Sequence, residues 1–352
     1  MGKRTAKTPG NVVDLFCGAG GLSYGFFQEG FNIVAGVDLD QACRYAFQEN
    51  NQSAFYAKDI RNVTGAWLKS IKWGRPRVLA GCAPCQPFSI YNPKNKDSQW
   101  KLLQEFARLV EETLPDVVTM ENVPALLKYR KGKVFGEFKA VLESCDYHIW
   151  HDVVFCPEYG VPQRRYRLIL LASRRGAIKM VAPRCKAGNF PTVRSAIKAL
   201  PRIAAGGVCR KDPLHKAALL SETNMKRIRQ SKRGGSWRDW DESLVSKCHT
   251  RDTGRRFLSV YGRMEWDEPA PTITTYFHGF GNGRFGHPSQ NRALSLREGA
   301  LLQSFPEWYA FAEKGQTIRM KEVGRMIGNA VPPRLARAIA QSINHHLQGY
   351  PT

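Results

Sequence analysis

Short apolar runs alternate with segments of helical periodicity through the first half of the sequence, and this alternation restricts the fold more than any other feature. The runs with the length and composition of buried strands are residues 12–16, 33–37, 78–80 and 117–120. A helix is expected at about 22–29, and apolar residues between Leu102 and Val110 recur at helical spacing. Because strands that alternate with helices form parallel sheets covered on both faces, the pattern predicts an α/β fold.

The second half of the sequence departs from this pattern. Residues 148–172 contain two extended segments around a stretch with Pro and Gly at 157–162, which predicts an antiparallel pair of strands. From about Arg184 the alternation is lost, and Pro, Gly, Arg and Lys dominate. Residues 333–349 are helical again with one apolar face, so this last helix is expected to pack on the larger domain.

These changes along the chain predict a basic tail, a large domain made of two stretches, a smaller irregular domain and a hinge segment. The expected ranges are 1–10 for the tail, 11–185 plus 322–352 for the large domain, 186–291 for the smaller domain and 292–321 for the hinge. The buried strand pattern lies in the large domain, which is therefore expected to hold the main core.

The net charge favours a polyanionic partner. Lysine and arginine number 53 against 30 aspartate and glutamate residues, so the formal charge is +23. Between Arg184 and Arg256 there are 18 basic and six acidic residues, so this span carries about half of the net positive charge. Clustering on this scale is typical of a surface that follows phosphates, so nucleic acid is the leading partner. No apolar run reaches the ~18 residues of a membrane span, so no membrane partner is expected.

The cysteines indicate a reducing compartment and one candidate nucleophile. Nine cysteines at irregular spacing, without a secretory signal, predict a cytoplasmic location and no disulfide framework. Cys85 lies on a Gly- and Pro-rich turn after the run 78–80, where a thiolate can act as a nucleophile. A buried structural cysteine is the alternative for this residue taken alone. Cys82 and Cys85 lack the second pair of ligands that zinc requires, so no metal site is expected.

Acidic residues stand at or near three successive strand ends. Asp14 precedes a glycine-rich turn at 18–21, Asp38 ends the next run, and Asp59 follows a third extended stretch. Glycines let backbone amides approach a ligand, and Asp14 suits a cationic ligand such as S-adenosylmethionine better than a pyrophosphate. Asp38 can bind both hydroxyls of a ribose, and Asp59 can accept from an adenine amino group. The alternative, a nicotinamide site, is disfavoured by the acid at position 14.

Two further polar features lie in strand-like segments. Glu121 follows the run 117–120, where a carboxyl group can exchange a proton with a substrate, although a helix cap or an ion pair is the alternative. Arg165 and Arg167 are two residues apart and point to one face of a strand, so they can bind a carbonyl or a carboxylate. An ordinary surface strand is the alternative for these arginines.

Six short motifs occur together in a fixed order. They are Asp14-x-Phe16-x-Gly18-x-Gly20, Pro84-Cys85-Gln86, Glu121-Asn122-Val123, Gln163-x-Arg165-x-Arg167, Arg292-x-Leu294-Ser295-x-Arg297-Glu298 and Gly328-Asn329-x-Val331. The ordered set resembles that of the cytosine-5 DNA methyltransferases of the bacterial and phage modification type, over residues 12 to about 340. The resemblance implies a Rossmann-like, S-adenosylmethionine-dependent methyltransferase sheet. The weakly matched stretch, about 186–271, falls where that family carries its target-recognition domain.

The resemblance also implies the catalytic roles. Cys85 would add to carbon 6 of a cytosine, which makes carbon 5 nucleophilic toward the methyl donor. Glu121 would protonate or hydrogen-bond ring N3, and Arg167, oriented with Arg165, would bind the O2 carbonyl. Because these atoms are inaccessible inside a stacked duplex, the base must be flipped out. The segment from Ser89 to Trp100 resembles the loop that closes over the flipped base.

The remaining implied site residues fall into two groups. Those expected to bind S-adenosylmethionine are Phe16, Gly18, Ala19, Gly20, Gly21, Asp38, Leu39, Asp59, Ile60, Pro84, Leu102, Asn329 and Val331. Leu39 stands where the family often has an aromatic residue on the adenine. Those expected to contact DNA are Gln86, Ser89, Thr272, Thr274, Tyr276 and Arg284.

The expected activity is therefore methylation of carbon 5 of cytosine in a short sequence of double-stranded DNA. The resemblance implies a monomer in the bacterial cytoplasm, at the nucleoid, with a cognate restriction endonuclease acting separately. The alternatives are a transfer RNA cytosine-5 methyltransferase and an inactive DNA-binding relative. The Cys-Phe-Thr signature of the RNA enzymes does not occur in this sequence, and the presence of Cys85, Glu121 and Arg167 argues against an inactive relative.

Overall fold

The computed structural model describes residues 8–84 and 100–349, which form two compact units. The sheet unit comprises Met1–Tyr159, Tyr166–Arg184 and Val331–Thr352, and the small unit comprises Gly160–Arg165 and Cys185–Ala330. No helix among the described residues is long and apolar enough to cross a membrane.

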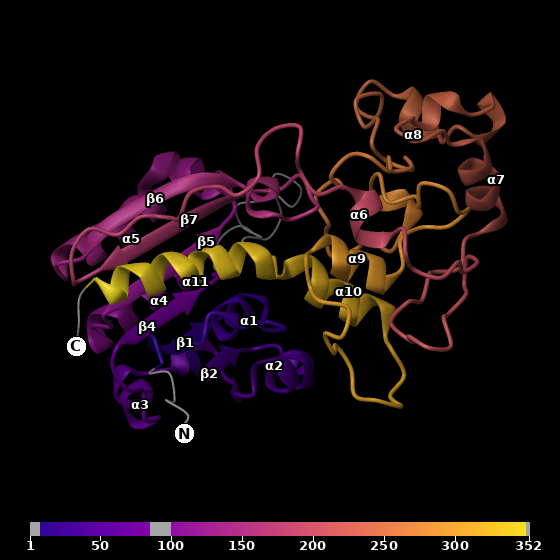
Figure 1. The fold of residues 1–352 in the computed structure, drawn as a ribbon. Helices are drawn as coiled ribbons and strands as arrows, with labels where there is room; N and C mark the ends of the chain where they lie inside the picture. The colour runs from indigo at the N-terminus through magenta and orange to yellow at the C-terminus, as the bar shows by residue number, and fades with distance from the viewer. Residues whose placement is uncertain (1–7, 85–99, 350–352) are drawn as a thin grey trace. The chain divides into compact units, whose positions relative to one another are not determined.

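The sheet unit is built on a seven-stranded sheet of the described residues (Figure 1). Its strands are β1 (Asn11–Leu15), β2 (Asn32–Asp38), β3 (Ala54–Ala57), β4 (Arg77–Gly81), β5 (Val117–Asn122), β6 (His148–Phe155) and β7 (Tyr166–Ser173). Their order is β3-β2-β1-β4-β5-β7-β6. The first five strands are parallel, and β7 runs antiparallel to both β5 and β6. The mostly parallel sheet and the antiparallel pair predicted from the sequence are confirmed.

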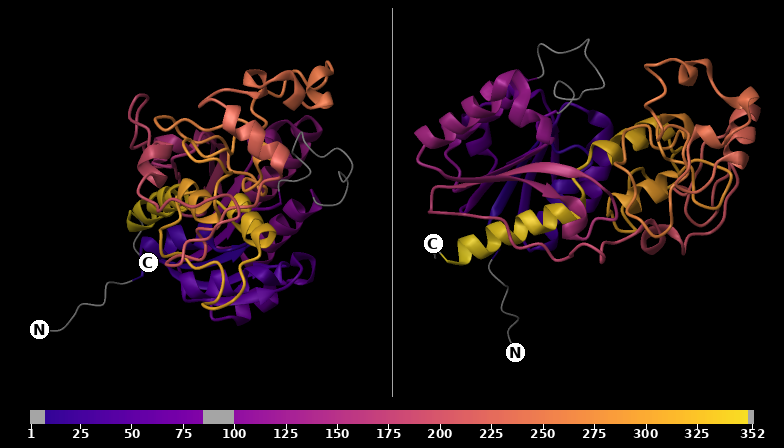
Figure 2. Two further views of the ribbon diagram at one scale, coloured as in Figure 1. Left: turned by 90° about the vertical axis from the view of Figure 1, so that its right-hand side faces the viewer. Right: turned by 90° about the horizontal axis from the view of Figure 1, so that it is seen from above.

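Helices cover both faces of this sheet. They are α1 (Gly21–Gln28), α2 (Arg44–Asn51), α3 (Gly65–Ser70), α4 (Lys101–Thr113), α5 (Lys133–Ser144) and α11 (Pro333–Gln348), with short 3-10 helices η1 (Gln41–Cys43), η2 (Ile60–Asn62), η4 (Pro124–Gly132) and η5 (Cys156–Tyr159). Figure 2 shows α5 and α11 on opposite faces. α4 packs against α3 and α5, whereas α1 packs against α11. The predicted packing of the last helix on the larger domain is confirmed.

Strand alternation explains why both faces are buried. On β1, Val13 and Leu15 belong to the core cluster that includes Phe106 of α4, while Val12 is fully buried but outside this cluster. Successive side chains of a strand point to opposite faces, so Val12 belongs to the other face. The mainly apolar run at 12–16, which Asp14 interrupts, therefore belongs to a strand covered on both sides.

A single glycine lets α1 and α11 approach closely. A Cβ atom at Gly25 would lie 2.4 Å from the backbone carbonyl carbon of Ala336. Atoms cannot come this close without displacement, so only glycine fits between the two helices at this point.

The small unit is irregular, as expected. Its helices are α6 (Val193–Ile197), α7 (Glu222–Gln230), α8 (Lys247–Thr250), α9 (Leu296–Leu302), α10 (Met320–Asn329), η6 (Trp237–Asp239), η7 (Glu242–Leu244) and η8 (Phe280–Asn282). Buried residues Ile228, Trp237, Trp240, Phe280 and Ala293 form a local core.

Arg263 connects the loops of the small unit. Its guanidinium group donates to the backbone carbonyls of Ser231 at 2.9 Å, Ile228 at 2.7 Å, His287 at 2.8 Å and Gln290 at 2.7 Å. Burial lowers the pKa of Arg263 from its ordinary value. These bonds satisfy buried carbonyls that no strand ladder satisfies, so one side chain replaces part of the role of a sheet.

The unit boundaries differ from the expected ranges. The expected hinge, 292–321, and residues 322–330 lie in the small unit, as do residues 160–165. The reason lies partly in an ion pair between α9 and the preceding part of the small unit: Nε of Arg297 donates to Oδ2 of Asp212 at 2.6 Å. α10 packs against α9, so the chain returns to the sheet unit only at Val331.

Candidate active site

The predicted site residues of the sheet unit gather at the side of the sheet where the parallel strands have their carboxyl ends. Leu15 of β1 pairs with Val37 of β2 and with Gly81 of β4, and Gly81 pairs with Met120 of β5. The carboxyl ends of these four strands are therefore level. β1 lies between β2 and β4. The chain adds β2 and β3 on one side of β1 and then β4 and β5 on the other, and open α/β sheets bind ligands at such a switch point.

The turn after β1 is held in a ligand-accepting conformation. Phe16, Gly18 and Gly20 have φ angles of 60°, 51° and 89°, in the left-handed region. The Gly18 amide donates to Asp38 Oδ2 at 2.8 Å. A Cβ atom at Gly20 would lie 2.2 Å from Nδ2 of Asn51, so this position requires glycine for space as well as for its φ angle. The predicted residues 16–21 thus form a preformed turn joined to the end of β2.

Asp38 and Leu39 lie beside this turn. The Oδ1 atom of Asp38 accepts from the Asp40 amide at 2.8 Å. Each carboxylate oxygen has two lone pairs, so both can accept further hydrogen bonds from hydroxyl groups. Leu39 is 69% exposed, so it presents an apolar surface beside the turn. An acid next to an apolar surface fits the ribose and adenine of a nucleoside.

Asp59 is paired with an arginine that sequence reasoning missed. It accepts from the Arg61 backbone amide at 3.0 Å and from its Nε atom at 2.9 Å. The side-chain bond from Arg61 lowers the pKa of Asp59, which keeps the carboxylate charged. An adenine amino group would share this carboxylate with Arg61. Ile60, the next residue, is buried and contributes to the core.

Asp14 is fully buried beneath the turn. Ser23 of α1 donates to its Oδ2 atom at 2.6 Å, and its Oδ1 atom has no hydrogen-bond partner among the described residues. Burial, more than any other factor, raises the pKa of Asp14 to about 7. The nearby charge of Asp38 raises it further, and the Ser23 bond opposes the change.

Glu121 and Arg167 form an ion pair, and Cys82 joins them. The Glu121 side chain is 3% exposed, and its Oε1 atom lies 2.8 Å from Nε of Arg167. This contact is an ion pair rather than a hydrogen bond, because Oε1 accepts none from the described residues. The Cys82 thiol lies 2.8 Å from Oε2. Asn122 fixes the same strand ends, since its Nδ2 atom donates to the Ala83 carbonyl at 3.0 Å.

Arg165 belongs to the small unit, where it supports a loop. Its Nη1 atom donates to the Ile273 carbonyl at 3.2 Å. Gln163, which is fully buried, accepts from the Ile273 amide at 2.8 Å and donates to Gln303 at 2.8 Å. These contacts hold the segment around Ile273. The sequence indicated Gln163 only as part of a motif, and the partnership with Gln303 was not predicted.

The predicted DNA-contacting residues of the small unit differ in their exposure and in the hydrogen bonds that they already make. Thr272 is exposed but donates to the Arg164 carbonyl at 2.7 Å, and Thr274 is exposed. Tyr276 is 48% exposed. Arg284 is half-buried, and its Nη1 atom donates to the Gly235 carbonyl at 2.5 Å. This anchoring reduces the number of donors that Arg284 can offer to a base.

Some predicted residues lie outside the described ranges or at their borders. Cys85, Gln86 and Ser89 fall within 85–99, outside the described residues. The remaining predicted cofactor residues are Pro84 and Leu102, which are half-buried, Val331, which is buried, and Asn329, which is exposed in the small unit. Over residues 8–84 and 100–349, no group of three or more His, Cys, Asp or Glu side chains is placed to hold a metal ion.

Comparisons with known proteins agree with this geometry. The model of the C-5 cytosine-specific DNA methylase family matches residues 10–345. The chain is 48% identical over 342 residues to the Type II methylase M.HgiDII of Herpetosiphon aurantiacus, covering 97% of this chain and 96% of that protein. It is 30% identical to the Type II methyltransferase M1.HphI of Haemophilus parahaemolyticus, covering 94% and 86%.

A solved structure shares the fold. A candidate DNA modification methyltransferase encoded within an Escherichia coli prophage superimposes with a TM-score of 0.74 at 24% identity, covering 96% of this chain and 99% of that one. The predicted Rossmann-like methyltransferase sheet is confirmed.

Proposed function

Because the chain belongs to the C-5 cytosine-specific DNA methylase family and is a DNA (cytosine-5) methyltransferase, we propose that S-adenosylmethionine is its methyl donor and that the reaction takes place at the sheet edge around Glu121. The observation that carries this proposal is the Glu121 carboxyl group. It is 3% exposed and ion-paired to Arg167, yet its Oε1 atom accepts no hydrogen bond from the described residues. An oxygen that no other hydrogen bond occupies is available to exchange a hydrogen bond or a proton with a ligand.

The residues present fit a nucleoside-containing methyl donor. The preformed turn at 16–21 offers backbone amides, Asp38 offers acceptors for ribose hydroxyls, and exposed Leu39 offers an apolar surface for adenine. Asp59 offers an acceptor for the adenine amino group, shared with Arg61. When bound, S-adenosylmethionine supplies an electrophilic methyl group. Phe16, Ala19, Ile60, Pro84, Leu102, Asn329 and Val331 complete the proposed cofactor set.

Cys85 is the proposed nucleophile. Its thiolate forms a bond to carbon 6 of the cytosine, and the displaced electron pair makes carbon 5 nucleophilic. After carbon 5 has taken the methyl group, loss of its proton restores the double bond between carbons 5 and 6 and expels the thiolate. The attacked atoms are covered in a stacked duplex, so the cytosine is flipped out before the reaction.

Glu121 and Arg167 stabilise the charge that this addition creates. Negative charge would otherwise build up on the ring, toward N3 and O2. Glu121 hydrogen-bonds or protonates N3, and Arg167, with Arg165, binds the O2 carbonyl. The 2.8 Å ion pair between Glu121 and Arg167 keeps the two groups adjacent, as neighbouring ring atoms require.

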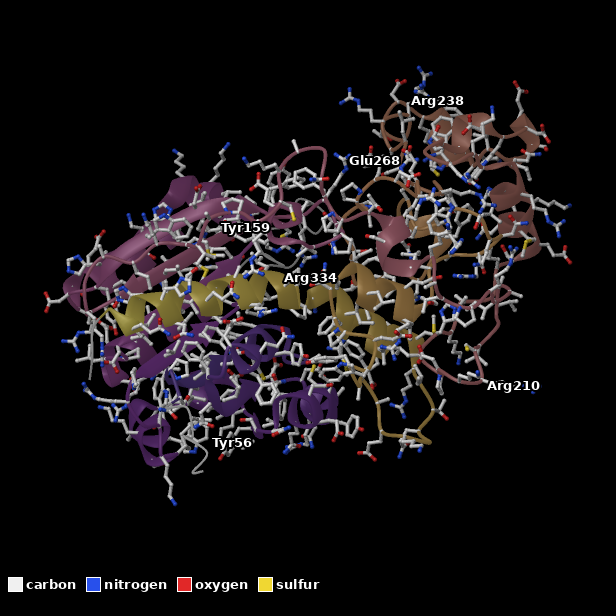
Figure 3. All side chains as sticks on the ribbon, in the orientation of Figure 1. Tyr56, Tyr159, Arg210, Arg238, Glu268 and Arg334 are labelled. Atoms are coloured by element: carbon white, nitrogen blue, oxygen red, sulfur yellow. The ribbon has the colours of Figure 1, made fainter. Side chains whose placement is uncertain are left out.

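The small unit is the proposed site of sequence recognition, over residues 186–291. Basic side chains such as Arg210 and Arg238 extend from its surface (Figure 3). Exposed arginines and lysines bind phosphates without sequence preference, whereas Thr272, Thr274, Tyr276 and Arg284 are the proposed base and backbone contacts. Gln86 and Ser89 are proposed to contact the DNA near the flipped base.

The Type II relatives support a setting for this activity. The proposed enzyme acts as a monomer on chromosomal DNA in the bacterial nucleoid. A cognate restriction endonuclease, if the host encodes one, would act as a separate protein that the methylation excludes from the same sites.

The test is transfer of a labelled methyl group from S-adenosylmethionine to duplex DNA, with transfer RNA as the competing substrate. We expect labelled 5-methylcytosine in DNA and none in RNA. Cys85→Ser should abolish transfer while S-adenosylmethionine still binds, and the same change at the partly buried Cys145 should leave transfer unchanged. Activity of Cys85→Ser within tenfold of wild type would contradict the covalent mechanism.

A further inference from the structure

Cys82 contacts the carboxyl group at the centre of the proposed site. It is the first residue after β4, and its Sγ atom lies 2.8 Å from Oε2 of Glu121 at the end of β5. β4 and β5 are neighbours in the sheet, so residues that follow their paired ends meet. The Cys82 amide donates to the Leu15 carbonyl at 3.3 Å, so the main chain fixes the position of the thiol.

The two oxygens of Glu121 therefore have different neighbours. Oε1 faces the Arg167 guanidinium at 2.8 Å, and Oε2 faces the Cys82 thiol. The terminal torsion of a glutamate side chain is broad, so a carboxyl held at one oxygen can rotate about its last bond. Contacts at both oxygens restrict this rotation.

We propose that Cys82 is a positioning residue for methyl transfer, whose thiol holds the Glu121 carboxyl group in the orientation that N3 of cytosine requires. This inference rests on the proposed role of Glu121. The thiol donates its hydrogen to Oε2 and Arg167 lies beside Oε1, so Oε1 is the oxygen left to exchange a proton with N3.

The same contact separates the role of Cys82 from that of Cys85. A thiol that donates its hydrogen to a carboxylate is protonated, whereas a nucleophile must be a thiolate. Cys82 also lies in no cluster of metal-binding side chains among the described residues. Its chemistry is therefore that of a hydrogen-bond donor.

The test compares side chains of similar size with and without a donor at position 82. Cys82→Ala and Cys82→Val remove the donor, and Cys82→Ser retains it. We expect kcat to fall about tenfold in the first two, as for a lost hydrogen bond to a charged group, with KM for DNA and for S-adenosylmethionine unchanged. Cys82→Ser should keep more than half of the activity. Cys145→Ala, at the end of α5, is the matched control and should equal wild type.

A double-mutant cycle with Glu121→Gln distinguishes action through Glu121 from a general structural effect. If Cys82 acts through Glu121, Cys82→Ala should reduce kcat much less in the Glu121→Gln background than in wild type. Equal reductions in both backgrounds would overturn the proposal, as would wild-type kcat in Cys82→Ala or Cys82→Val. If Glu121→Gln itself keeps full activity, the role proposed for Glu121 fails first. Thermal unfolding of each variant identifies losses of activity that come from instability. If Cys82→Ala is unstable, the comparison of Cys82→Val with Cys82→Ser decides the outcome.

Discussion

At the scale of single residues, the site depends on carboxyl groups whose partners set their chemistry. Asp38 accepts from two backbone amides and stays partly exposed, Asp59 is paired with Arg61, and Asp14 is buried and accepts from Ser23. The sequence placed all three acids near strand ends and gave each a contact with a different part of one ligand, without indicating their partners. The structure distinguishes them by burial and by charge partner.

We predict that Asp38→Ala weakens S-adenosylmethionine binding by roughly 1.5–3 kcal/mol, the usual cost of losing a charged acceptor. Asp38→Asn should weaken it less, because an amide oxygen still accepts one bond. Titration calorimetry measures both, with Glu111→Ala on the exposed side of α4 as the charge-matched control. Unchanged affinity in Asp38→Ala would mean that this residue only holds the turn.

We predict a pH dependence of stability that originates at Asp14. Its pKa is raised from 3.8 to about 7 in the folded chain, so between these values the folded state keeps a proton that the unfolded state has released. Stability therefore falls as pH rises through this window, by about 4 kcal/mol in all. Urea unfolding at pH 4 and pH 8, without methyl donor, should show wild type losing stability relative to Asp14→Asn. Parallel pH profiles of the two proteins would rule out this origin.

At the scale of secondary structure, close packing depends on where glycine stands. Gly25 of α1 faces the backbone of Ala336 in α11, whereas a Cβ atom at Gly136 of α5 would meet nothing within 4 Å. The two glycines look alike in the sequence, because each interrupts a helical pattern. Only the packed structure shows that one is required for space and the other is not.

We predict opposite effects for alanine at these two positions. Gly136→Ala should stabilise the chain by roughly 0.5–1 kcal/mol, because it reduces the entropy of the unfolded state without a clash. Gly25→Ala should destabilise it by roughly 1–3 kcal/mol, because α1 and α11 must move apart. Chemical unfolding of both variants is the measurement, and a stabilised Gly25→Ala would show that the two helices shift at little cost.

The sequence predicted the strands and several helices well and the contacts between side chains poorly. Apolar runs and helical spacing located the strands and α1, α4 and α11, because a sheet covered on both faces has a strong local pattern. Side-chain partners leave no such pattern. The contacts of Cys82 with Glu121 and of Gln163 with Gln303 join residues 39 and 140 positions apart. The boundary at Val331 was missed for a similar reason, since it depends on α10 packing against α9.

At the scale of the whole molecule, charge and chemistry are distributed unequally along the chain. The span from Arg184 to Arg256 holds 18 basic and six acidic residues, and nearly all of it belongs to the small unit. Glu121 and Arg167 belong to the sheet unit. The proposed DNA contacts of the small unit can therefore change while the proposed reacting groups stay the same.

We predict that replacing residues 186–291 with the matching span of a relative changes which sequence is methylated and leaves the chemistry intact. Bisulfite sequencing of a genome exposed to the chimera is the measurement, and methylation at the original sites would place recognition elsewhere. Binding of the wild-type protein should weaken steeply with salt, because phosphate contacts release counterions. Removing single exposed charges, such as Arg238, should weaken binding to all sequences alike.

The guanidinium group of Arg263 has a consequence for how new specificities can arise. Four of its acceptors are main-chain carbonyls, which every amino acid provides. The side chains at 228, 231, 287 and 290 are thus interchangeable as far as these four bonds are concerned. Arg263 itself and Asn291, whose Oδ1 atom also accepts from Arg263, are restricted in chemical type. A scaffold organised in this way tolerates substitution of its other loop residues, so the proposed base contacts of the small unit can change while its fold is kept.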